Sequence, residues 1–212
     1  MKNPINRAYW HFAALLLAAG AGCVTFPHSA GAQDLSPNVR IAIADWCGKK
    51  AADLTTNDLA KITELEFDNN SVRARVFPVK IADLEGKSSP FPKDMRITDD
   101  DLANLDKLPA LNEIKLSDTE VSDAGLEHLA KLPAIRCLYL SETHVTDAGL
   151  KHLANLSTLS VLDLSHTQVT DEGLQYLKNL PKLHMLTLWF SRVTRDGVKQ
   201  LRKEMPNCRI NE

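Results

Sequence analysis

Apolar residues recur every 24 positions along the second half of the chain, and four positions of each unit take part. The recurring sets are Leu111, Ile135, Leu159 and Leu183; Ile114, Leu138, Leu162 and Leu186; Leu116, Leu140, Leu164 and Leu188; and Ile97, Val121, Val145, Val169 and Val193. Units that repeat with such a period form solenoids, in which each unit packs only against its neighbours. The repeat therefore predicts an elongated fold with one continuous apolar core.

Each unit carries the signals of a short strand followed by a helix. Leu162 and Leu164 alternate with their neighbours, as the buried side chains of a strand do. Residues 170–173 then place a hydroxyl before two carboxylates, which favours the start of a helix. Residues 174–177 begin and end with leucine, so both leucines share a helical face, and Pro181 ends the helix because it has no amide hydrogen.

These residues resemble the leucine-rich repeat family, whose core pattern is L-x-x-L-x-L-x-x-N/C/T-x-L, from Leu102 to about Ile210. The resemblance implies an α/β fold, a right-handed solenoid with parallel strands on the concave side and helices on the convex side. At the ninth position, where the family usually has Asn or Cys, this chain has a hydroxyl column similar to the Val-Thr-Asp-x-Gly-Leu repeats of bacterial proteins. We expect its hydroxyls to satisfy backbone groups in the turns: Thr119, Thr143, Thr167 and Ser191.

The first 32 residues have the pattern of a secretory signal. Lys2 and Arg7 precede an apolar run over residues 13–26, and Ala30-Gly31-Ala32 supplies small residues where a signal peptidase reads. The run is shorter than the roughly 20 residues of a membrane span. We therefore expect cleavage after Ala32 and no membrane span in the mature chain.

A lipoprotein signal is the main alternative for this segment, with Cys23 as the lipidated residue, although Gly20 stands where leucine is usual. An uncleaved anchor is a third possibility. Cleavage would leave 23 basic and 27 acidic residues, a net charge of −4. This charge gives no indication of a nucleic-acid partner.

Residues 33–95 are less regular and predict an N-terminal cap, which a solenoid needs to cover the apolar end of its first unit. Val39, Ile41 and Ile43 alternate and predict a capping strand.

Two degenerate repeats follow, one over residues 62–70 and half of another over 76–81. The Ser/Pro-rich residues 86–94 predict a protruding loop. Residues 96–212 form the predicted repeat domain, and its last helix and strand predict a C-terminal cap.

The sequence shows no motif for catalysis or for a cofactor: it has no Gly-rich phosphate loop, nucleophile motif or Cys-x-x-Cys pair. His144 and His166 follow successive strands, but no third ligand is evident, so we expect no metal site there. The column Asp123, Asp147 and Asp171 follows hydroxyl residues, where the helix dipole favours carboxylates without calcium.

The residues that point away from the core on the strands form the predicted binding surface. Trp189 and Phe190 interrupt columns of small or polar residues there, and large aromatic residues on an open surface are typical of binding hot spots. The alternative is that they pack on the cap strand over residues 208–210. The candidate protein-binding residues are Tyr139, Val161, Asp163, Met185, Trp189 and Phe190.

The sequence thus predicts an exported, non-enzymatic module that recognises a protein partner and needs no cofactor. The alternatives are an architectural envelope protein without a specific ligand, an F-box-type substrate adaptor and a hydrolase. We further expect Cys47, Cys137 and Cys208 to remain unpaired. Cys137 and Cys208 should lie three strands, or roughly 14 Å, apart, whereas the Cα atoms of a disulfide are at most about 7 Å apart.

Overall fold

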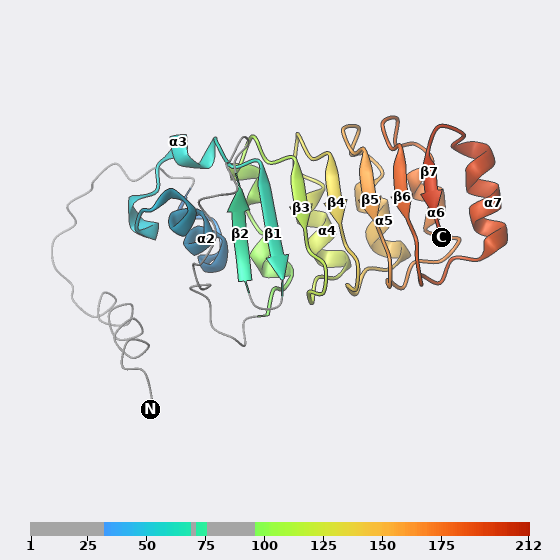
Figure 1. The fold of residues 1–212 in the computed structure, drawn as a ribbon, viewed down its shortest axis with the longest axis horizontal. Coiled ribbons are helices and arrows are strands. Elements are labelled where there is room, and N and C mark those ends of the chain that lie inside the picture. The colour runs from blue at the N-terminus through green and yellow to red at the C-terminus, as the bar shows by residue number, and fades with distance from the viewer. Residues whose placement is uncertain (1–31, 69–70, 76–95) are drawn as a thin grey trace, which may run out of the picture.

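The computed structural model describes residues 32–68, 71–75 and 96–212. Figure 1 shows a single row of strands along the molecule, with helices behind them. The order in the sheet is β2-β1-β3-β4-β5-β6-β7. The strands are β1 (Glu64–Asp68), β2 (Ser71–Arg75), β3 (Glu113–Lys115), β4 (Cys137–Tyr139), β5 (Val161–Asp163), β6 (Met185–Thr187) and β7 (Arg209–Asn211).

The strand register follows the 24-residue period. From β3 to β6 the strands are parallel, and their central residues pair in the series Ile114, Leu138, Leu162 and Leu186. Each of these strands buries its middle residue and leaves the two outer residues half-buried. The predicted strand pattern is therefore confirmed.

Helices return the chain from each strand to the next. The repeat region contains η3 (Asp99–Leu102), η4 (Leu105–Lys107), α4 (Asp123–Leu129), α5 (Asp147–Leu153), α6 (Leu174–Leu177) and α7 (Arg195–Glu204). The helix predicted from residue 170 onward is shorter than expected, because turn residues precede α6. Leucines on the helices meet those of the strands in one apolar core that continues from Ala32 to Ile210. Full burial of each such side chain contributes roughly 1.5–3 kcal/mol.

An aspartate ladder joins each unit to the next on the helix side. Both carboxylate oxygens of Asp123 accept hydrogen bonds from Thr146, one from its backbone N–H at 2.8 Å and one from its hydroxyl at 2.6 Å. The same two bonds recur, each across 23 residues, in the pairs Asp99–Ser122, Asp147–Thr170 and Asp171–Thr194. The helix dipole thus explains only part of the preference for aspartate at these positions, since the carboxylates also bind the neighbouring units.

The ladder requires a glycine in each unit. A Cβ atom on Gly149 would lie 2.3 Å from Oδ1 of Asp123, and one on Gly173 would lie 2.2 Å from Oδ1 of Asp147. No Cβ atom tolerates such a distance, so the glycine makes room for the carboxylate of the preceding unit. This explains the glycine of the Val-Thr-Asp-x-Gly-Leu pattern by packing.

The hydroxyl column at the ninth position lies inside the turns. Each hydroxyl donates a hydrogen bond to the carbonyl oxygen three residues earlier, for example from Thr143 to Leu140 at 2.7 Å. Thr119, Thr167 and Ser191 do the same at 2.7–2.8 Å. The predicted structural role of these hydroxyls is confirmed.

The N-terminal cap contains α2 (Pro37–Cys47), η1 (Ala51–Asp53) and α3 (Thr56–Leu59), and Figure 1 places α2 beside β2 at one end of the sheet. The prediction of a capping strand at residues 39–43 is wrong. Val39 and Ile43 are four residues apart on the buried side of α2, whereas Ile41 is 42% exposed. The Ser36 hydroxyl accepts a hydrogen bond from Val39 N–H, and Pro37 occupies the first turn, so local capping favours the helix.

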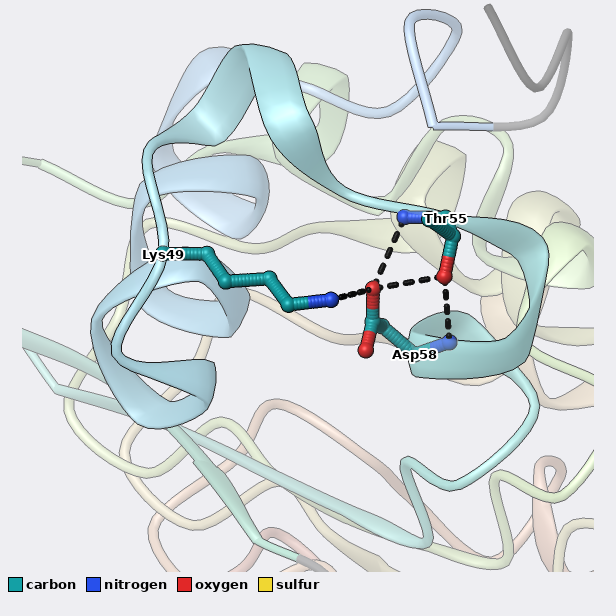
Figure 2. Close-up of polar contacts among 3 residues, drawn as sticks. All are labelled: Lys49, Thr55 and Asp58. Carbon is teal, nitrogen blue, oxygen red and sulfur yellow. Dashed lines mark hydrogen bonds and ion pairs between the residues drawn. The ribbon is translucent and has the colours of Figure 1, made fainter.

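A polar cluster fixes the turn between α2 and α3 (Figure 2). Asp58 accepts hydrogen bonds from the Lys49 ammonium at 2.8 Å and from the Thr55 N–H and hydroxyl. The Thr55 hydroxyl accepts in return from Asp58 N–H, which completes a capping box. These bonds lower the pKa of Asp58 to about 2, with the hydrogen bond from Lys49 as the main cause.

β1 continues the solenoid, as the degenerate repeat at residues 62–70 predicted. Leu65 pairs in parallel with Ile114 of β3, while β2 pairs with β1 in the antiparallel direction. β1 and β3 are direct neighbours in the sheet. The half-repeat at 76–81, the loop at 86–94, and residues 1–31 with Cys23 lie outside the described residues.

β7 and α7 form the last strand and helix of the described residues. β7 is parallel to β6 and is the last strand of the sheet, and α7 lies beside it at the end of the molecule (Figure 1). Met205, Cys208 and Ile210 are buried there at 7–8% exposure and close the apolar core.

Candidate functional site

The candidate site lies on the sheet face, which we define as the outward side chains of β3 to β6. They form two columns across the strands. The first contains Glu113, Cys137, Val161 and Met185, and the second contains Lys115, Tyr139, Asp163 and Thr187. All are half-buried, because adjacent strands cover part of each side chain.

Charged groups occupy the N-terminal half of the sheet face. The Lys115 ammonium forms ion pairs with Glu64 and, at 3.1 Å, with Glu113. Burial alone would lower the pKa of Lys115, but its hydrogen bonds to the two carboxylates outweigh this effect and raise it. The ammonium also lies 6.0 Å from the centre of the Tyr139 ring, whose pKa is raised chiefly by burial. Lys115 is thus engaged by groups of the protein itself.

Apolar groups occupy the C-terminal half. Val161 and Met185 pair as direct neighbours on β5 and β6. Trp189 and Phe190 follow β6 and are 52% and 80% exposed, respectively. Four of the six predicted site residues therefore lie at this end.

The other two predicted residues lie next to this apolar end. Tyr139 and Asp163 are neighbours in the second column. The Asp163 carboxylate accepts hydrogen bonds from the Ser165 N–H at 2.9 Å and hydroxyl at 2.6 Å. These bonds hold the carboxylate in one orientation at the edge of the apolar group.

A ridge of four exposed residues borders the sheet face at the carboxyl ends of the strands: Asp118, Glu142, His166 and Phe190. All four have left-handed backbone angles, with φ between 55° and 59°. Such angles are uncommon for residues other than glycine, although asparagine, aspartate and histidine adopt them more often than the rest. The rings of His166 and Phe190 stack with their centres 4.6 Å apart and their planes at 24°. The ridge therefore ends in an ordered pair of rings.

Three members of the ridge, Asp118, Glu142 and His166, were not among the predicted site residues. All three are polar residues in turns, and their type alone does not mark them as surface-site residues. The signal in the sequence was positional, because all three align with Phe190 at intervals of 24 residues.

A metal site at His144 and His166 is not supported by the repeat geometry. His166 is a ridge residue. His144 is exposed and lies two positions after the ridge residue Glu142, so the two histidines occupy different positions of the repeat. The described residues contain no group of three or more His, Cys, Asp or Glu side chains able to hold a metal ion. Among the helices of the described ranges, none has the length and apolar character that crossing a membrane requires.

A family model described as leucine-rich repeat matches residues 155–178. Internalin C2 of Listeria monocytogenes is structurally similar over 90% of this chain and 70% of its own, with 21% sequence identity and a TM-score of 0.58. A leucine-rich repeat protein of Leptospira interrogans is similar over 51% of this chain and 27% of its own, with 23% identity and a TM-score of 0.41. The search of curated proteins found no significant match.

The likeness to internalin C2 concerns the fold, and it agrees with the parallel register and with the helices behind the sheet. The repeat match covers one unit of the same series. We conclude that this chain has the α/β leucine-rich repeat fold, an open solenoid with strands on one side and helices on the other.

Proposed function

We propose that this chain is an exported recognition module that binds a protein partner through the apolar C-terminal end of its sheet face. The observation that carries the proposal is the exposure of Trp189 and Phe190, adjacent aromatic residues that follow a short, rigid strand. Solenoids of this type commonly use the strand side to bind other proteins. In this proposal the function is binding and not catalysis.

The energetics favour this end of the sheet face. Tryptophan is enriched among the residues that contribute most to protein interfaces. The site lies on hydrogen-bonded strands and turns, so little ordering entropy opposes association. The backbone carbonyl of Trp189 accepts a hydrogen bond from His166 N–H at 2.8 Å, which fixes the start of the turn. Trp189 thus has the properties of an anchor.

The test is capture of partners from the exported fraction of the native cells, followed by measurement of the affinity of the captured protein. Trp189→Ala should weaken binding by at least about thirtyfold, which corresponds to roughly 2 kcal/mol. Tyr176→Ala is the matched control, because Tyr176 is an exposed aromatic residue on α6, on the helix side of the sheet. It should leave affinity unchanged.

Melting temperatures of the same variants separate binding from folding. If Trp189 seals the C-terminal cap instead, Trp189→Ala should lower the melting temperature by many degrees while the folded fraction binds normally. A loss of affinity below threefold would remove Trp189 from the site. If the wild-type protein captures no specific partner, an architectural role is the better interpretation.

A further inference from the structure

The ridge of Asp118, Glu142, His166 and Phe190 is a linear row with one residue per repeat. Neighbouring strands of a sheet lie about 4.8 Å apart, so successive ridge residues have about the same spacing. Backbone hydrogen bonds fix the row. Asp118 N–H donates to the Ser141 carbonyl oxygen at 2.9 Å, and Glu142 N–H donates to the Ser165 carbonyl oxygen at 3.0 Å. The ridge is therefore a rigid row with a known interval between side chains.

The two ends of the ridge differ in chemistry. One end carries the Asp118 and Glu142 carboxylates, which are exposed and have no ion-pair partner within 4.0 Å among the described residues. The other end carries the stacked rings of His166 and Phe190. The ridge thus changes from anionic to aromatic along its length.

The neighbouring charges leave this polarity in place, because those near Asp118 are paired with one another. The nearest cation of the sheet face, Lys115, is already shared by Glu64 and Glu113. Two positions beyond the ridge residues lies a parallel column of Glu120, His144, Gln168 and Arg192. Its acidic residue, Glu120, is ion-paired with Arg96 and so adds no net charge at the Asp118 end, whereas Arg192 lies at the Phe190 end. A bound cation is therefore favoured near Glu142 and Asp118 and disfavoured near Phe190.

We infer that the ridge selects an extended segment of the protein partner in which a large apolar or aromatic residue is separated by three to four positions from lysine or arginine. This inference rests on the proposed function and specifies the chemistry of the partner. Glu142 is two repeats from Phe190 and Asp118 is three, or about 10 and 14 Å. An extended chain rises about 3.3 Å per residue, so these distances correspond to three and four residues.

The test is selection of random peptides displayed on phage against the wild-type protein. We expect enriched peptides with an apolar or aromatic residue and, three to four positions away, lysine or arginine. The affinity of a synthetic consensus peptide should fall at least tenfold with Asp118→Lys/Glu142→Lys. It should also fall as salt is added, since exposed charge pairs are screened. With the double variant as the target, the basic preference should disappear.

Two further variants control for folding and for net charge. Asp118→Asn/Glu142→Gln keeps the shape of both side chains, removes both charges and should weaken the binding of the peptide at least threefold. Glu127→Lys/Glu172→Lys makes the same change of charge as the reversal, at exposed positions on the helix side, and should alter affinity less than twofold. All variants should unfold within a few degrees of the wild type.

The possible failures can be told apart. Peptides that depend on Trp189 but lack a basic residue at this spacing, or that tolerate the charge reversal, would overturn the inference and leave the proposed function standing. Selection that enriches no peptide would also overturn the inference alone, whereas failure to capture a partner from the native cells would contradict the proposed function on which it rests.

Discussion

The carboxylate of Asp147 binds Thr170 of the next unit twice, through the Thr170 N–H at 2.8 Å and its hydroxyl at 2.6 Å. Thr170 N–H is thereby satisfied at a turn where the backbone forms no regular ladder. The Thr170 hydroxyl in turn accepts from Glu172 N–H at 3.3 Å. One side chain thus connects two repeats and supports the turn before α6.

This arrangement predicts a strong coupling between Asp147 and Gly173. In most helical settings glycine to alanine stabilises by up to about 1 kcal/mol, but at Gly173 the new Cβ would lie 2.2 Å from Asp147 Oδ1. Gly173→Ala should therefore lower the free energy of unfolding. In an Asp147→Ala background the same change should be less damaging, with a coupling of at least about 1 kcal/mol in a double-mutant cycle. Additive effects in denaturant unfolding would contradict the steric explanation.

The buried hydroxyl column predicts that Thr143→Val is destabilising although valine has the same shape. Thr143 is 4% exposed and its hydroxyl is the partner of the Leu140 carbonyl. Loss of this bond leaves the carbonyl unpaired, at a cost of about 1–3 kcal/mol. Thr143→Ser keeps the hydroxyl and is the control. Equal melting temperatures for the wild type and Thr143→Val would contradict the structural role of the Thr143 hydroxyl.

The capping box at Asp58 predicts a stability contribution that depends on pH. The pKa of Asp58 is lowered from 3.8 to about 2 by the hydrogen bonds from Lys49 and Thr55, so the native state favours the carboxylate. This contribution is fully present above about pH 4 and is lost as the pH falls toward 2. Asp58→Asn should thus reduce stability at pH 7, by about 1 kcal/mol, and the difference from wild type should shrink below pH 3. Asp53→Asn, at an exposed position, is the control. A stability difference between Asp58→Asn and the wild type that does not depend on pH would refute the role of ionisation.

The strand order predicts that no intramolecular disulfide forms between the cysteines of the repeats. Cys137 begins β4 and Cys208 precedes β7, so three strand steps, or about 14 Å, separate them. Burial also raises the pKa of all three described cysteines, for Cys208 to about 11. The unreduced mature protein should show the mass of free thiols, and native Cys208 should react slowly with iodoacetamide at pH 8 but quickly in urea. A mass lower by two hydrogens would indicate an internal bridge.

The proposed export predicts Gln33 as the first residue of the mature protein, since the Ala-x-Ala site ends at Ala32. N-terminal sequencing of protein purified from the native cells measures this directly. A lipid-modified Cys23 at the N-terminus would instead support the lipoprotein alternative, and an intact Met1 would support an uncleaved anchor.

The repeat region was predictable from sequence because its pattern recurs. Any single Leu-x-Leu segment fits several structures, but four copies at one interval fix strand, turn and helix together. The paired residues Ile114, Leu138, Leu162 and Leu186 lie as this interval predicted. The Asp ladder was not predictable, because helix-dipole stabilisation already gave a sufficient reason for acidic residues there.

The N-terminal cap shows why unrepeated sequence is harder to interpret. Val39, Ile41 and Ile43 alternate, yet α2 forms because Ser36 and Pro37 cap its start and Gly48, at φ 63°, ends it. These capping signals were present in the sequence and outweighed three alternating residues. For the candidate site, the position of Trp189 and Phe190 was predicted, but the stack of Phe190 on His166 depends on backbone angles that residue type does not indicate.

The aspartate ladder also bears on how a chain of this kind changes in length over evolution. Each of the four carboxylates binds a hydroxyl residue 23 positions later, and the three middle units, which contain Asp123, Asp147 and Asp171, supply both partners. A duplication or deletion of 24 residues, wherever its boundaries fall within the regular units, restores the same pairs at the new junction. Insertions of other lengths break them. The junction chemistry therefore permits growth and loss by whole units, while the residues on the strand side remain free to diverge.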